Sequence, residues 1–145
     1  MRAPLLISLL LASAPALAQP AGFPALDRNG DGYLSRVEAL ADQEIYKRFA
    51  QFDVNGDRQL SATEYLAARE DNQRRARHDA ALTARVKAAL STERGIRAGA
   101  IAVETYEGRV QLSGFVPLPD MASRAGRVTA GVNGVRSVHN NITVK

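Results

Sequence analysis

The chain has 145 residues, a formal net charge of +4 and no cysteine, which excludes a disulfide framework and any thiolate chemistry. Its halves differ in charge: residues 19–70 carry six Lys/Arg and nine Asp/Glu, net −3, and residues 71–145 carry twelve and six, net +6. An acidic half suits a cation site, whereas a basic half is compatible with anionic partners.

Residues 1–18 are typical of a secretory signal peptide. Arg2 gives a positive start, Leu5 to Leu11 is an apolar run, and Ala16-Leu17-Ala18 is a cleavage signal. The apolar run is too short to span a membrane as a helix, and no later stretch is long or apolar enough. We therefore expect export, cleavage after Ala18 and a periplasmic mature chain.

Two copies of one twelve-residue pattern follow, DRNGDGYLSRVE and DVNGDRQLSATE. Each copy has oxygen-bearing side chains at positions 1, 3, 5, 9 and 12, and the backbone carbonyl of position 7 adds another oxygen. Ca²⁺ prefers such a shell of about six to eight oxygens. The candidate calcium ligands are Asp27, Asn29, Asp31, Tyr33, Ser35 and Glu38 in the first loop, and Asp53, Asn55, Asp57, Gln59, Ser61 and Glu64 in the second.

The same residues allow a simpler interpretation. The segments from Ser35 to Glu38 and from Ser61 to Glu64 are capping boxes that start helices, and Asn-Gly-Asp is ordinary turn chemistry. The repetition of five oxygen positions, each copy with leucine at position 8, favours calcium binding. At position 6 the second copy has Arg58 in place of glycine, so we expect its site to be the weaker one.

Residues 36–52 predict one helix between the loops, because apolar residues recur there at helical spacing. The two loop starts, Asp27 and Asp53, are too close in sequence for two helices and a linker. Residues 19–26 leave little chain for a helix before the first loop. The predicted apolar face consists of Val37, Leu40, Ala41, Ile45, Phe49 and Phe52.

On these loops, residues from about 21 to 66 resemble a pair of EF-hands, in the compact form of exported bacterial proteins. The resemblance implies a helical domain that binds Ca²⁺, with boundaries at 19–68. Dockerin modules also have closely spaced calcium loops, but they usually end the loop with Asp, where this chain has Glu38 and Glu64.

Residues 69–78 predict a helical linker between two domains. The sequence contains no glycine or proline that would interrupt a helix, and it has no apolar stripe that would bury one. We interpret it as an exposed connector. The alternative is recognition of an acidic partner by Arg74, Arg75 and Arg77.

Residues 79–145 read as helix, strand, strand, helix, strand. The first helix has Leu82, Val86, Ala89 and Leu90 on one face, and residues 101–106 alternate as a half-buried strand. A two-residue turn at Glu107-Gly108 leads into a second strand. Pro119 and Asp120 begin the second helix, whose predicted buried stripe is Met121, Ala125, Val128 and Val132. The last strand contains Val138, Ile142 and Val144.

The segments VKAAL at 86–90, EGRVQLSGFV at 107–116 and GVRSVHNNITV at 134–144 resemble the BON domain of bacterial envelope proteins, over about residues 80–145. The resemblance implies two helices packed on a three-stranded mixed sheet. It also implies binding to phospholipid membranes or to periplasmic proteins, and it carries no catalytic signature. Candidate phosphate contacts are Arg94, Arg97, Arg109, Arg124, Arg127 and Arg136; the alternative is a scattered, solubilising set.

We find no arrangement of residues that predicts an enzyme. The only histidines are His78 and His139, neither at a recognisable spacing from a serine, and the chain has no glycine-rich phosphate loop. We expect no nucleic-acid partner.

The sequence therefore predicts an α+β, periplasmic, calcium-binding protein whose BON domain contacts anionic phospholipid or an envelope protein. The alternative is a structural, stress-related periplasmic protein with Ca²⁺ as a permanent folding staple. Calcium affinity, partner and oligomeric state stay open.

Overall fold

The computed structural model describes residues 19–145, so the predicted signal peptide at 1–18 lies outside the described residues. The chain divides into two units, one ending at Arg69 and one comprising Glu70–Lys145. Each unit has a hydrophobic core of its own, and we describe each by itself. None of the helices within residues 19–145 is long and apolar enough to cross a bilayer.

The first unit contains α1 (Phe23–Leu26), β1 (Tyr33–Ser35), α2 (Arg36–Ala39), α3 (Gln43–Phe52), β2 (Gln59–Ser61) and the start of α4 (Ala62–Thr92). Strands β1 and β2 pair antiparallel and place Leu34 directly opposite Leu60, both fully buried. Phe23 packs edge-on against Tyr65, with ring centroids 5.3 Å apart. These contacts close a small core around the two loops.

The predicted single helix at 36–52 is wrong, because the chain forms two helices separated at residues 40–42. The Asp42 carboxylate accepts the backbone N–H groups of Glu44 and Ile45, at 3.1 and 3.2 Å, and so caps the start of α3. The break turns part of the predicted apolar face outward: Val37 is 77% and Leu40 52% exposed. Ile45 and Phe49 are buried as predicted.

Helix α4 runs without interruption from Ala62 to Thr92, through the region predicted as a linker and into the helix expected after residue 80. Tyr65 and Ala68 are buried in the first core, and Leu82 is the next buried residue along the helix. The intervening turns are exposed or half-buried, as expected for a helical segment without an apolar stripe.

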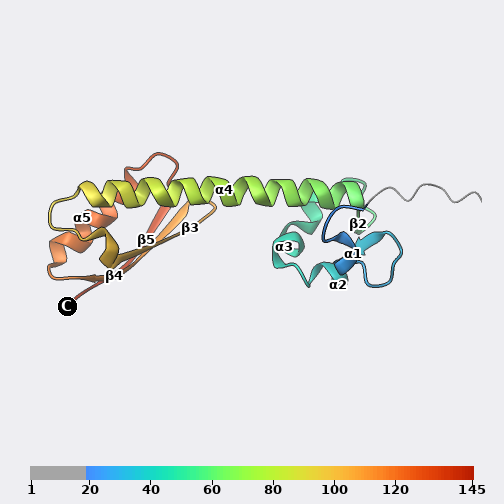
Figure 1. The fold of residues 1–145 in the computed structure, drawn as a ribbon, viewed down its shortest axis with the longest axis horizontal. Helices are drawn as coiled ribbons and strands as arrows, with labels where there is room; N and C mark the ends of the chain where they lie inside the picture. The colour runs from blue at the N-terminus through green and yellow to red at the C-terminus, as the bar shows by residue number, and fades with distance from the viewer. Residues whose placement is uncertain (1–18) are drawn as a thin grey trace, which may run out of the picture. The chain divides into compact units, whose positions relative to one another are not determined.

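The second unit adds η1 (Ala98–Ala100), β3 (Ile101–Tyr106), β4 (Arg109–Val116), α5 (Pro119–Ala130) and β5 (Ser137–Val144) to the rest of α4 (Figure 1). The strand order is β3-β4-β5, with β3 antiparallel and β5 parallel to β4. This is the predicted mixed sheet of three strands.

One face of this sheet packs on the helices. Its buried side chains alternate along β3 and β4, and they contact buried residues of α4 and α5. The predicted stripe of α5 packs on this core, with Ala125 fully buried and Met121, Val128 and Val132 partly buried. The buried members are Leu82, Val86, Leu90, Ile96, Ile101, Val103, Val110, Leu112, Val116 and Ala125.

Candidate metal loops and basic surface

The first loop is organised around the side chain at its position 1. Asp27 is only 8% exposed, and its carboxylate accepts the N–H groups of Gly30 and Gly32 at 2.8 and 3.0 Å. Both glycines have positive φ, 71° and 83°, which lets the backbone fold back onto the carboxylate. The side chain of Asn29 likewise accepts the backbone N–H of Asp31 at 3.0 Å, so it also bonds to the backbone of its own loop.

Glu38 joins the two ends of the first loop. Its Oε1 accepts the N–H groups of Arg28 and Asn29, at 3.0 and 3.3 Å. Its Oε2 accepts the Ser35 hydroxyl at 2.6 Å and the Ser35 N–H at 2.9 Å, within the predicted capping box. The hydroxyl of Ser35, followed by these N–H donors, lowers the pKa of Glu38 to about 2. The carboxylate is therefore anionic at neutral pH.

The second loop repeats most of this pattern. Glu64 accepts the N–H of Val54 at 3.0 Å, together with the hydroxyl and N–H of Ser61 at 2.7 and 2.9 Å. Burial raises the pKa of Glu64, but these hydrogen bonds outweigh it and the net pKa is lowered. Asn55 accepts the N–H of Asp57 at 3.0 Å, as Asn29 does at the same position.

The loops differ at Asp53 and Arg58. Asp53 Oδ2 accepts the N–H of Arg58 at 3.0 Å, but Asp53 Oδ1 is buried and has no hydrogen-bond partner. Arg58 has φ 69°, a positive value like the 83° of Gly32 at the same position of the first loop. A buried carboxylate oxygen without a donor is costly unless a cation satisfies it.

The side-chain oxygens of the two loops therefore suit a hard cation such as Ca²⁺. Among them, Asp53 Oδ1 is buried and accepts no hydrogen bond. Within residues 19–145, no three acidic or histidine side chains converge on one point in the way a metal cluster does. Glu38 and Glu64 instead use their oxygens to accept N–H groups of their own loops. An ion would have to draw on the remaining lone pairs of these oxygens.

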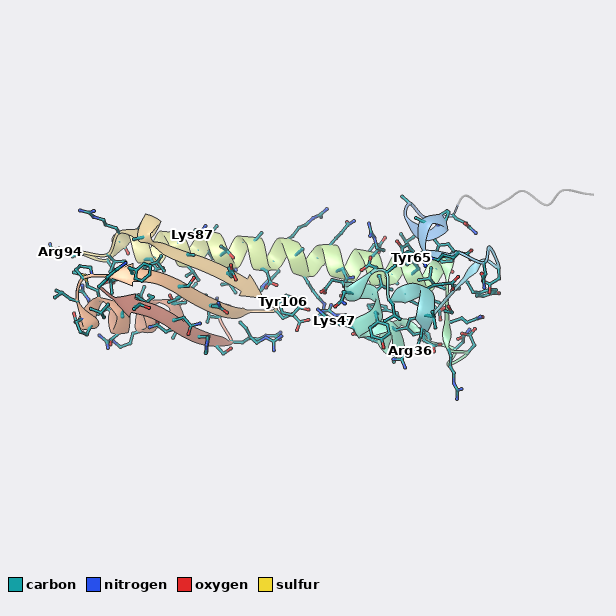
Figure 2. The ribbon with its side chains drawn as sticks, turned by 90° about the horizontal axis from the view of Figure 1, so that it is seen from below. Arg36, Lys47, Tyr65, Lys87, Arg94 and Tyr106 are labelled. Atoms are coloured by element: carbon teal, nitrogen blue, oxygen red, sulfur yellow. The ribbon has the colours of Figure 1, made fainter. Side chains whose placement is uncertain are left out.

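The six candidate arginines of the second unit do not form one surface. Arg94, Arg97 and Arg124 lie at one end, where Arg124 Nη2 donates to the carbonyl of Arg94 at 2.9 Å. Arg109 and Arg136 lie at the other end, beside the β3–β4 turn. Figure 2 shows Arg94 and Tyr106 at these opposite ends of the unit. Arg127 is exposed on α5.

The arginines of the predicted linker have partners within the second unit. Arg75 forms an ion pair with Asp71 at 2.6 Å, which raises the pKa of Arg75 and lowers that of Asp71, and it approaches Glu107 at 3.5 Å. Arg74 also pairs with Asp71, at 3.2 Å. Recognition of an acidic partner would have to compete with these contacts.

Sequence reasoning missed Asp79. Its carboxylate accepts the N–H groups of Glu107 and Gly108, at 2.6 and 3.0 Å, and so fastens the β3–β4 turn to α4. Both turn residues have positive φ, 51° and 76°, as a two-residue hairpin turn requires. The sequence predicts the turn itself, but a contact between residues so distant in the chain has no local signal.

Comparison with known proteins identifies the second unit. Residues 78–145 match the family model of the BON domain, so the predicted BON domain is confirmed. Over 67 residues the chain is 43% identical to Osmotically-inducible protein Y of Escherichia coli (strain K12). The aligned part covers 46% of this chain and 33% of that protein, so the chain spans about a third of the length of this relative.

Proposed function

We propose that the protein is an exported, calcium-binding protein of the bacterial envelope, with an EF-hand pair and a BON domain that contacts anionic phospholipid. The observation that carries the calcium proposal is the repeated geometry of the two loops. They meet at the β1–β2 pair, and their position-1 carboxylates and position-12 glutamates accept hydrogen bonds from equivalent backbone groups.

The ions would be held by the twelve oxygen-bearing positions named above, and a bound ion would supply positive charge to loops rich in carboxylates. Asp53 Oδ1 supports this assignment, because a cation would satisfy an oxygen that is otherwise buried without a partner. Glu38 is anionic at neutral pH, as a carboxylate ligand of Ca²⁺ must be.

The BON half of the proposal rests on charge and on the family match. Residues 71–145 carry a net charge of +6, which attracts an anionic membrane surface. The name of the Escherichia coli relative refers to osmotic induction. We extend an osmotic-stress role in the envelope to this chain, as a binding protein and not a catalyst. The alternative partner is an envelope protein.

The test of calcium binding is isothermal titration of the purified protein and of Glu38→Gln. The substitution keeps the size of the side chain but removes its charge and its ability to give two equivalent oxygens. We expect the tighter of two sites to weaken at least tenfold. Asp120→Asn is a matched control, because it removes one acid from the second unit. Unchanged binding in Glu38→Gln would refute the assignment of the first loop.

Calcium affinity separates a responsive site from a permanent staple. A dissociation constant near the ambient Ca²⁺ of the periplasm makes the first unit a sensor. A site that is saturated at every relevant concentration makes Ca²⁺ a structural component, as the alternative hypothesis holds.

Export is tested by the intact mass of protein recovered from the periplasmic fraction. We expect a chain that begins at Gln19. A cytoplasmic product that retains Met1 would contradict the proposal.

A further inference from the structure

The BON domain exposes a group of apolar side chains at one end. Phe115 and Leu118 are 56% and 54% exposed, and Pro117 between them is exposed too. We define Phe115, Pro117 and Leu118 as the apolar tip. A large aromatic and a leucine on one short exposed segment are costly in water and indicate a contact surface.

Basic side chains lie at the same end of the domain as this tip. Lys145 Nζ lies 4.9 Å from the centroid of the Phe115 ring. Arg97 lines the same pocket as Phe115 and Pro117, and Arg94 is next in sequence to Gly95, which also lines it. All three cations are exposed, and we define Arg94, Arg97 and Lys145 as the basic collar.

Acidic groups neutralise this end only in part. Asp120 forms an ion pair with Arg124 at 3.2 Å, and Glu93 is half-buried. With Arg124 counted, this end has four basic side chains and two acidic side chains. At the opposite end Arg109 lies 3.5 Å from Glu107, which also approaches Arg75, so cations there have acidic neighbours.

The backbone that carries the tip is held firmly in place. The N–H of Lys145 donates to the carbonyl of Val116 at 3.0 Å, which joins the end of β5 to the tip. A Cβ atom at Gly114, where φ is 144°, would overlap the carbonyl oxygen of Ala100, so this glycine allows the 98–100 segment to pack on β4. A pre-ordered surface loses little conformational entropy on binding.

We propose that the apolar tip inserts into the headgroup–acyl boundary of an anionic bilayer while the basic collar contacts lipid phosphates. This inference rests on the proposed function, and it names the part of the BON domain that contacts the membrane. Apolar side chains gain by entering the boundary, and long basic side chains keep their charges at headgroup level. Anionic lipid is the occupant that matches both the apolar centre and the positive surround.

The chain contains no tryptophan, so one introduced indole gives a site-specific fluorescence signal. Phe115→Trp places it in the tip, and Tyr106→Trp is the matched control at the other end of the domain. With vesicles of phosphatidylglycerol and phosphatidylcholine, we expect the emission of Phe115→Trp to shift to the blue and to be quenched by brominated acyl chains. The emission of Tyr106→Trp should not change. Equal quenching in both variants, or none in Phe115→Trp, overturns the inference.

Charge variants test the collar. The pair Arg94→Gln/Arg97→Gln and the control pair Arg109→Gln/Arg136→Gln remove the same charge from opposite ends. Two basic residues near a membrane predict a loss of vesicle affinity of roughly thirtyfold for the collar pair. The control pair should lose only a few-fold. Equal losses would mean that net charge alone attracts the protein to the membrane. That result would contradict insertion of the apolar tip but not the proposal that the domain binds anionic lipid.

The apolar contribution is tested by Phe115→Ser/Leu118→Ser, with Tyr106→Ser as the control. We expect the tip pair to lose binding at physiological salt, where screening weakens the charges. The control should bind as the unchanged protein does. If the unchanged protein fails to bind any anionic vesicle at low salt, the lipid proposal itself fails and an envelope protein becomes the partner.

Discussion

Arg58 occupies a backbone conformation that favours glycine. Its φ is 69°, whereas the equivalent position of the first loop is Gly32 with φ 83°. A left-handed conformation costs a non-glycine residue roughly 1–2 kcal/mol. Where the ion-free loop relaxes out of this conformation and binding restores it, the second loop binds Ca²⁺ several-fold to tens-fold more weakly than an equivalent loop with glycine.

We expect Arg58→Gly, in a Glu38→Gln background that isolates the second loop, to raise calcium affinity there. The added flexibility of glycine should cancel about 0.4–1 kcal/mol of the gain. Calorimetric titration measures the change. The reverse substitution, Gly32→Arg with the second loop weakened by Glu64→Gln, should lower affinity. No gain in Arg58→Gly would show that Arg58 does not limit the site.

Thr129 is a buried polar residue in the core of the BON domain. It is fully buried, and its hydroxyl has no hydrogen-bond partner. Thr129→Val keeps the shape but removes the hydroxyl, so we expect unfolding to require about 1 kcal/mol more, since an unsatisfied buried hydroxyl costs roughly 1–3 kcal/mol. Denaturant unfolding measures this. Thr129→Ala is the control for packing, and a less stable Thr129→Val would show that the hydroxyl is satisfied by buried water.

The turn between β3 and β4 depends on one side chain from α4. Asp79 accepts two turn N–H groups, so Asp79→Asn replaces one acceptor by a donor and leaves an N–H without a partner. We expect a loss of about 1–3 kcal/mol in unfolding free energy. Glu104→Gln is a matched control on the exposed face of β3 and should change stability little. Equal effects of the two substitutions would mean that general charge, and not the turn contact, matters.

Elements were predictable where the signal was local. The alternation of apolar and polar residues predicts the strands β3 and β4, and Glu107-Gly108 predicts the turn between them. Pro119 predicts the start of α5. These local patterns were enough to predict the order of elements in the BON domain. The break between α2 and α3 was missed because apolar spacing continues across Asp42, although a capping Asp before Gln-Glu-Ile was a readable signal. The division of the arginines between two ends depends on how strands and helices pack, which spacing cannot reveal.

Within residues 19–145, hydrophobic packing is divided between two separate cores. The buried residues of one core, such as Leu34 and Phe49, belong to a different cluster from those of the other, such as Val86 and Leu112. In α4 no residue between Ala68 and Leu82 is buried. The cooperative unit of folding is the core, so the chain should unfold in two steps.

Calcium should raise only one of these two transitions, because every candidate ligand lies in the first unit. At one hundred times the dissociation constant, one site adds about 2.7 kcal/mol to stability. In a small domain this corresponds to an increase in Tm of roughly 10–20 °C. Scanning calorimetry with Ca²⁺ and with a chelator measures the shift. The transition of the BON domain should stay within a degree or two.

Two variants assign the transitions. Glu38→Gln/Glu64→Gln should abolish the calcium-dependent shift, whereas Thr129→Val should move only the transition that does not respond to Ca²⁺. Helix α4 contributes Tyr65 to one core and Leu82 to the other. A single unfolding transition whose midpoint temperature rises with Ca²⁺ would show that this helix transmits the stabilisation from the first unit to the second. In that case Ca²⁺ would also stabilise the BON domain, and the division into two folding units would be wrong.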